Sequence, residues 1–135
     1  METITIINDI SVFYVTAKSF PDGVMEAHQK LHDLVHLDKD RKFFGISRPA
    51  NGVIVYKAAA EELYPGEGKK LNTATLVLNK GNYIALKITD YMNDLPGIGK
   101  AFEELLSQPG LDPQGYCVEW YLDNKDVKCM IRLAE

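Results

Sequence analysis

The feature that most constrains the fold is a predicted β-hairpin at residues 115–133, with a carboxylate in the middle of its first strand. Two runs of strand-forming residues are separated there by a short polar turn. Because side chains alternate across a strand, Glu119 shares one face with Cys117 and Tyr121. Trp120 points to the opposite face. A carboxylate in such a strand faces water, pairs with a cation, or belongs to a site that uses its charge.

The pairing of this hairpin bears on its two cysteines. A two-residue turn at 124–125 would place Cys117 opposite Arg132. Cys129 would then lie opposite Trp120, so the two thiols would face opposite sides of the sheet. A disulfide between them is geometrically disfavoured in that arrangement. We therefore expect two reduced cysteines, as is typical of a cytoplasmic protein.

The composition indicates a single globular domain spanning residues 1–135. Apolar residues make up 46% of the chain and charged residues 25%, which is unlike a disordered protein. The net charge of -4 lacks the basic excess of nucleic-acid-binding proteins, so we expect no direct nucleic-acid partner. No apolar run approaches the roughly 20 residues of a membrane span, and residues 1–10 do not resemble a signal peptide. We expect a cytoplasmic protein without membrane attachment.

Hydrophobic periodicity predicts similar elements in both halves of the chain. The elements of the first half are strands at 3–7 and 10–17, a helix near 22–36, and a hairpin of 43–47 with 53–59. Those of the second half are strands at 73–78 and 83–89, a helix beginning after Asn93 or Asp94, and the hairpin at 115–133. Residues 60–72, which contain Pro65 and two glycines, interrupt the pattern and are predicted to connect the halves.

A shift of 71 residues aligns the two halves. It places the apolar stripe of the first predicted helix on that of the second, beginning with Val24 on Leu95. Pseudo-repeats at about 10–60 and 73–133 predict an α+β fold built from duplicated βαββ units. The units would form one antiparallel sheet, with two helices on one face and a ligand groove on the other.

Five segments carry a resemblance to a known family. They are a helix at 20–35, Gly45-Ile46-Ser47-Arg48-Pro49, Lys80-Gly81-Asn82-Tyr83, a helix at 98–106, and above all Tyr116-Cys117-Val118-Glu119-Trp120-Tyr121. Together, over about residues 10–133, they resemble the GyrI-like effector-binding domain family. The resemblance implies duplicated SHS2-type βαββ units around a groove that contains a glutamate of the penultimate strand. Glu119 matches the position of that glutamate.

The resemblance also implies a choice of functions. Members of this bacterial family are effector or multidrug sensors fused to DNA-binding regions, stand-alone proteins, and in some branches hydrolases of cyclopropane-containing genotoxins. No region remains for a helix-turn-helix once both halves are assigned. We therefore expect a stand-alone protein.

Strand alternation indicates which side chains line the groove. If Ile84 and Leu86 pack under the helices, Tyr83 faces the other side, and the 71-residue shift places Tyr14 there too. The candidate ligand-binding residues are Glu119, Tyr121, Cys117, Tyr14, Tyr83, Phe43, Tyr56 and Met130. Aromatic walls around one carboxylate suit an amphipathic, flat aromatic ligand, particularly a cationic one.

Structural interpretations of the same residues stand beside this one. Under the predicted pairing, Glu119 faces Met130, and Lys128 and Arg132 lie diagonally, within reach of a salt bridge. The tyrosines could form an ordinary half-buried sheet face. Trp120 is assigned to the core under the helices, without a functional role.

No cofactor or metal is expected. His28, His32 and His36 recur at a spacing that can bind zinc, but no His-Glu-x-x-His motif or third ligand accompanies them. Cys117 would act as a nucleophile only with a nearby base, and the sequence identifies none.

Three functions are compatible with these residues. The favoured one is the sensing or sequestering of a small molecule. In the alternative, Glu119 is a general base on water while Tyr121 or Tyr14 hydrogen-bonds a strained substrate, which is hydrolysed. The third is a protein-interaction module, which predicts an apolar sheet face without an enclosed pocket.

Overall fold

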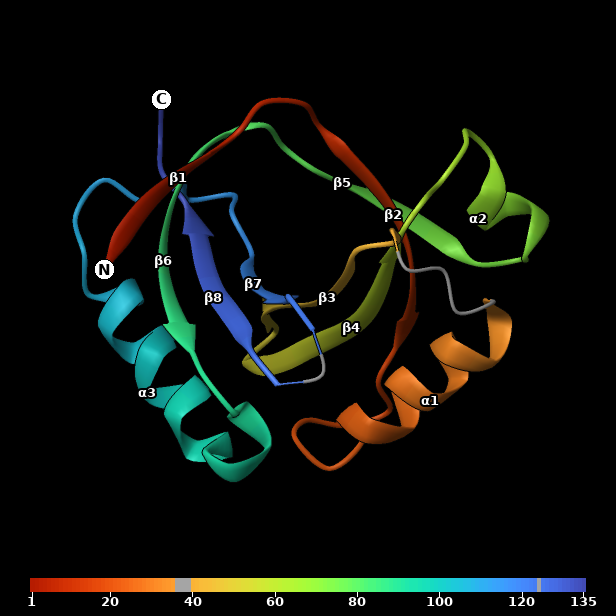
Figure 1. Ribbon diagram of the computed structural model, residues 1–135, viewed down its shortest axis with the longest axis horizontal. Helices are drawn as coiled ribbons and strands as arrows, with labels where there is room; N and C mark the ends of the chain where they lie inside the picture. Colours follow the sequence, from red (N-terminus) through yellow and green to blue (C-terminus); the bar gives the residue numbers. More distant parts are fainter. Residues whose placement is uncertain (36–39, 124) are drawn as a thin grey trace.

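The computed structural model describes residues 1–35, 40–123 and 125–135, and it shows an α+β fold with one curled antiparallel sheet (Figure 1). The strands are β1 (Glu2–Ile6), β2 (Ile10–Thr16), β3 (Phe43–Ala50), β4 (Val53–Glu61), β5 (Ala74–Leu78), β6 (Gly81–Ile88), β7 (Cys117–Tyr121) and β8 (Val127–Arg132). The helices are α1 (Val24–Leu34), α2 (Glu67–Lys70), α3 (Leu95–Leu106) and the short 3₁₀ helix η1 (Tyr91–Asn93). No helix in these described ranges is long and apolar enough to cross a membrane.

The strand order brings the two halves of the chain together at the centre of the sheet. The order is β1-β6-β8-β7-β3-β4-β2-β5, so the β3–β4 and β7–β8 hairpins meet where β3 pairs with β7. At the ends of the sheet, β1 pairs with β6 and β5 pairs with β2. Each end strand therefore pairs with a strand from the other half of the chain.

Helices α1 and α3 pack on the same face of the sheet. Ala27 and Leu31, one helical turn apart, bury α1 against β2 and β4, and Ala101 and Leu105 bury α3 against β6 and β8. Residues that pair across adjacent strands point to the same face of a sheet. Phe43 pairs with Ala60, which packs under α1, and with Tyr121, which packs under α3, so both helices cover one face. Figure 1 shows both helices outside the curl of the sheet.

The inner face of the curled sheet holds a core of its own. Its buried residues are Val12, Phe44, Ile46, Ala59, Leu78, Tyr83, Ala85, Val118 and Met130. Trp120 packs against this cluster and so lies on the face opposite the helices. The prediction that Trp120 lies under the helices is wrong, because both faces of the curled sheet are apolar and hydrophobicity alone does not tell them apart.

The last hairpin pairs one residue away from the predicted register. Glu119 pairs with Cys129 and Trp120 with Lys128, because the connection is a longer loop closed by a bond from the Leu122 amide to the Asp126 carbonyl oxygen (3.0 Å). The predicted two-residue turn includes Asn124, which lies outside the described residues. A shift of one residue exchanges the faces of a strand. The prediction about the cysteine faces is consequently wrong.

Both cysteines are nevertheless free. Cys117 and Cys129 lie on the same face of the sheet, but Cys117 pairs with Ile131 and Cys129 pairs with Glu119. The two thiols are therefore not direct cross-strand neighbours.

The segment predicted as a connection contains the short helix α2. A buried ion pair holds it in place, since Arg41 donates to both carboxylate oxygens of Glu67 at 2.8 and 2.9 Å. Arg41 also donates to the carbonyl oxygen of Glu61, at the end of β4 (2.8 Å). This bidentate geometry ties the start of β3 to α2 and stiffens the connection.

Candidate functional site

Glu119 lies in the middle of β7 on the face covered by the helices. Its neighbours in the sheet are Cys129 on β8 and Gly45 on β3. A Cβ atom at Gly45 would lie 2.0 Å from the hydroxyl oxygen of Tyr56 and 2.6 Å from Oε1 of Glu119. Glycine at this position therefore leaves the space in which Tyr56 and Glu119 meet.

One oxygen of this carboxylate accepts two hydrogen bonds from tyrosines. The hydroxyl of Tyr56 donates to Oε1 of Glu119 at 2.9 Å, and the hydroxyl of Tyr121 donates to the same atom at 2.5 Å. The two hydroxyl oxygens are 3.2 Å apart. Each hydroxyl has a single proton, so a tyrosine that donates to Glu119 can only accept from its other neighbours.

His28 of α1 extends this network. Its Nε2 lies 2.8 Å from the hydroxyl oxygen of Tyr56. When Tyr56 donates its proton to Glu119, His28 is the donor of this contact, in the tautomer that is protonated on Nε2. Burial, with a smaller contribution from His32, lowers the pKa of His28 to about 4, so the ring is neutral at pH 7.

Further aromatic rings pack on Tyr56 and Tyr121 from α1 and from the segments that precede α1 and α3. Phe20, just before α1, stacks on Tyr56 with ring centroids 5.8 Å apart. Tyr91 of η1, just before α3, lies 5.5 Å from the ring of Tyr121, and His28 lies 5.3 Å from the same ring. The two helical segments therefore converge on one aromatic site.

Glu119 has no cationic partner among the described residues. Lys128 pairs with Glu2 (3.0 Å), and Arg132 pairs with Asp112 (3.0 Å). The predicted alternative of a salt bridge from Glu119 to Lys128 or Arg132 is therefore wrong. Those side chains belong to other ion pairs, and Lys128 is placed on the Trp120 face by the one-residue shift of the hairpin.

Burial raises the pKa of Glu119, and the hydrogen bonds from Tyr121 and Tyr56 offset only part of this effect. The residue as a whole is half-buried. In the described chain no donor reaches its second oxygen, Oε2, and this atom is not buried away from solvent. The site thus has one carboxylate oxygen engaged by tyrosines and one without a donor in the described chain.

Cys117 is a poor nucleophile in this setting. Burial and the neighbouring Glu119 raise the pKa of its thiol to about 11. The reactive species of a cysteine is the thiolate, which is scarce at neutral pH for such a group.

The structure divides the candidate ligand-binding residues between the two faces. Those on the same face as Glu119 are Tyr121, Cys117, Phe43 and Tyr56. Those on the opposite face are Tyr14, Tyr83 and Met130. The expectation that Glu119 faces away from the helices is wrong, because the register of β7 with β3 and β8 places it beneath them.

Sequence reasoning missed Phe20, His28 and Tyr91 as parts of this site. A signal for two of them was present, because the 71-residue shift places Phe20 on Tyr91. No comparable signal marks His28, whose spacing suggested a metal site instead. Among the described residues no group of three His, Cys, Asp or Glu side chains could hold a metal ion, and His36 lies outside them.

Comparisons with known proteins bear on the fold. No protein-family model matches the chain, and no curated protein matches it significantly. An integron cassette protein from the mobile metagenome of Vibrio cholerae has a similar structure, with a TM-score of 0.69 and 16% identity over 98% of this chain and 94% of that one. A hydrolase from Listeria innocua is also similar, with a TM-score of 0.64 and 10% identity over 98% of this chain and 90% of that one. At these identities, the likeness establishes a shared small α+β fold with a curled sheet.

Proposed function

We propose that this chain is a GyrI-like small-molecule-binding domain that captures flat aromatic cations at Glu119, between α1 and α3. The observation that carries the proposal is a carboxylate that has no cationic partner in the described chain and is held by two tyrosines on which further aromatic rings pack. A carboxylate removed from water is costly unless it is paired. An organic cation would supply the missing charge.

The aromatic rings favour a flat cation over a small inorganic one. A cation over a tyrosine face gains roughly 0.5–2 kcal/mol, and the apolar body of the ligand gains from burial. Phe20 is 42% exposed, so part of the aromatic wall is available to a ligand. Capture of such compounds would serve the sensing or sequestering of drugs.

As part of the proposed GyrI-like fold, we propose that the two halves of the chain are copies of one βαββ unit. The 71-residue shift carries β1 to β5, β2 to β6 and α1 to α3, and the sheet order is symmetric about the β3–β7 pair under this exchange. It also exchanges Phe20 and Tyr91, which flank the site from opposite sides. A duplicated unit would thus provide a similar aromatic wall from each half.

The test uses one ring system in three charge states: aminoacridine as the cation, acridine as the neutral compound, and acridine carboxylate as the anion. Binding is measured by isothermal titration calorimetry and thermal shift at mildly alkaline pH. We expect the cation to bind wild-type protein at least about tenfold more tightly than the other two, a difference of about 1.4 kcal/mol. Ligand at about 100 times its dissociation constant stabilises a fold by about 2.7 kcal/mol.

The Glu119→Gln variant should lose this preference for the cation. Glu103→Gln is the matched control, because Glu103 is an exposed carboxylate on α3 and its loss removes the same charge from the chain. Equal binding of the cation to wild type and Glu119→Gln would overturn the proposal. Failure of all three compounds to bind would favour the protein-interaction alternative.

Hydrolysis at the same site is the second candidate function. The raised pKa of Glu119 favours it, because a carboxylate of raised pKa is a better general base. Glu119 would take a proton from water, whose oxygen attacks an ester carbonyl or a strained ring carbon, and the leaving oxygen or carbon would then receive the proton. Mass spectrometry of ester and cyclopropane probes incubated with the protein distinguishes the functions. A binder leaves the probes intact, whereas a hydrolase splits the ester into acid and alcohol and adds one water to the opened cyclopropane ring.

A further inference from the structure

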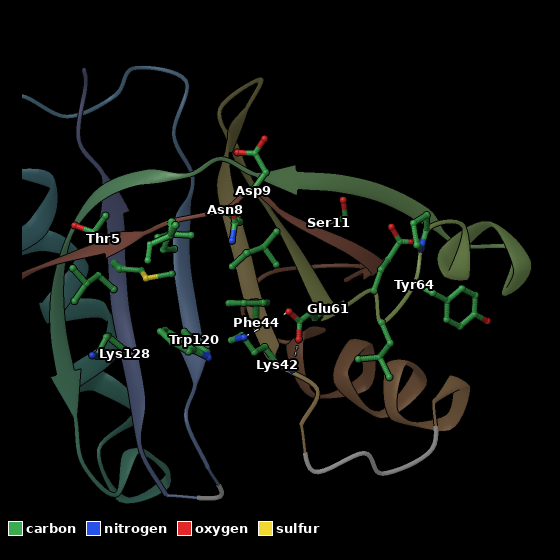
Figure 2. Close-up of a pocket in the computed structure, with 18 of the residues that line it drawn as sticks. Thr5, Asn8, Asp9, Ser11, Lys42, Phe44, Glu61, Tyr64, Trp120 and Lys128 are labelled. Carbon is green, nitrogen blue, oxygen red and sulfur yellow. Dashed lines mark hydrogen bonds and ion pairs between the residues drawn. The ribbon is translucent and has the colours of Figure 1, made fainter.

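A cavity of about 730 Å³ lies on the face of the sheet opposite Glu119 (Figure 2). Phe44, Trp120 and Met130 form its apolar floor, and all three belong to or pack against the core of the inner face. Strand β1 and the connection from β1 to β2 form one wall, and residues 61–66 form another. Its volume falls in the range of about 300–1,000 Å³ that is typical of small-molecule sites.

The two lysines that line this cavity are paired with carboxylates. Lys42 pairs with Glu61 (3.6 Å), as the dashed line in Figure 2 shows, and Lys128 pairs with Glu2 (3.0 Å). The other two charged lining residues accept backbone hydrogen bonds, each at 2.8 Å: Asp9 from the amide of Lys80, and Glu62 from the amide of Gly68. Both cationic lining residues, Lys42 and Lys128, are therefore engaged in ion pairs, and the described lining offers no free cation to an anionic ligand.

We propose that this cavity is a second binding site, for a neutral and largely apolar aromatic molecule that packs on Trp120 and Phe44. A neutral ligand leaves the ion pairs of Lys42 and Lys128 intact, whereas an anion would have to break one of them or remain unpaired beside Asp9 and Glu62. The ring of Trp120 offers a large apolar surface against which an aromatic ligand stacks. This site is separate from the proposed cation site, because Trp120 and Glu119 are consecutive residues of β7 and point to opposite faces.

The probe for this proposal is N-phenylnaphthylamine, a neutral molecule whose fluorescence rises in apolar surroundings. Its sulfonated analogue, anilinonaphthalenesulfonate, is the anionic comparison. We expect saturable binding of the neutral probe, with the anion at least about tenfold weaker. Trp120 is the single tryptophan of the chain, so its emission reports on the floor of the cavity. Bound probe should reduce the quenching of Trp120 by acrylamide.

Two substitutions in β1 test where the neutral probe binds. Ile6 of β1 lines the cavity. In Ile6→Tyr the larger side chain should fill the cavity and weaken binding of the neutral probe at least about tenfold. Thr3→Tyr is the matched control, because Thr3 pairs with Ile84 and lies on the outer face of the same strand. Thr3→Tyr and Glu119→Gln should both bind the neutral probe with a dissociation constant within about twofold of that of wild type.

Several outcomes would overturn the proposal. They are absence of saturable binding, equal binding of the anion, and loss of binding in Glu119→Gln but not in Ile6→Tyr, which would place the probe at the other face. If Ile6→Tyr does not fold, the acrylamide measurement on wild type decides the question. Undiminished quenching of Trp120 in the presence of saturating probe would then refute the second site.

Discussion

Glu119 combines two properties that conflict in a protein without a ligand: its carboxylate is partly removed from water, and no described cation compensates it. Two tyrosines and, behind them, His28 provide hydrogen bonds instead. Such bonds stabilise the ionised form, but they do not outweigh burial. Under the proposed function, a cationic ligand would supply the charge that this carboxylate lacks.

Replacing Glu119 by glutamine should therefore stabilise the free protein at neutral and alkaline pH. The folded-state pKa of Glu119 is raised, so the folded protein holds this proton more tightly than the unfolded chain. Stability is consequently lost as pH rises from the ordinary value of about 4.3 through the raised one. Glutamine does not ionise, so the melting temperature of Glu119→Gln should exceed that of wild type by a margin that grows with pH.

Thermal melts of both proteins between pH 4 and pH 8 measure this margin, where each kcal/mol corresponds to about 4 °C. His28 also contributes to the pH dependence of stability. Its contribution is the same in both proteins and has the opposite sign to that of Glu119. The lowered pKa of His28 makes both proteins lose stability as pH falls from about 6.5 toward about 4. A glutamine variant that melts below wild type at pH 8 would show that ionised Glu119 has a structural role.

At the scale of elements, the site depends on how closely β3, β4 and β7 approach one another at Gly45. The hydroxyl of Tyr56 occupies the space where a side chain at Gly45 would begin. The periodicity of the sequence predicted these strands, but the glycine was noted there only as part of a turn-strand motif. Its role as the space for a buried hydrogen bond depends on a neighbouring strand, which local sequence does not reveal.

Gly45→Ala should displace Tyr56 from Glu119 and destabilise the fold by about 1–3 kcal/mol, the usual cost of overpacking. Gly99→Ala is the matched control, because nothing lies within 4 Å of a Cβ placed there and alanine is the better helix former in α3. That variant should be stabilised by about 0.5–1 kcal/mol. Urea unfolding followed by Trp120 fluorescence measures both, and an unchanged midpoint for Gly45→Ala would argue against a tightly packed contact.

At the scale of the whole molecule, the curled sheet separates two candidate sites of different chemistry. The helix-covered face carries a carboxylate without a cationic partner among the described residues, and the inner face carries an apolar cavity whose two lysines are in ion pairs. One strand, β7, contributes to both through Glu119 and Trp120. If both proposals hold, the chain binds two classes of small molecule at once.

The two sites should fill independently, because their ligands contact opposite faces and share no side chain. Calorimetric titration with aminoacridine, in the presence and absence of saturating N-phenylnaphthylamine, should give dissociation constants within about twofold of each other. Coupling between binding sites is reciprocal, so the reverse titration should agree. A change of more than about fivefold in either direction would show that the ligands compete or that β7 transmits a coupling between them.

The sequence by itself determined the local elements and the neighbours of Glu119 along its strand. Apolar periods of two and of about 3.6 residues predicted the strands and both long helices, and alternation predicted that Cys117 and Tyr121 share the face of Glu119. These features depend on contacts between residues close together in the chain. For that reason they could be predicted without knowing the fold.

Only the tertiary structure decided which face the helices cover and which residues complete the site. Both sheet faces are apolar because the sheet curls around its own core, so Trp120 and Glu119 could not be assigned to their faces from hydrophobicity. The register of the last hairpin depended on a loop whose length local sequence left open. Tyr56 donates to Glu119, His28 bonds to Tyr56, and Tyr91 packs on Tyr121, each from a separate element. Such long-range contacts are set by strand order and register rather than by any local pattern.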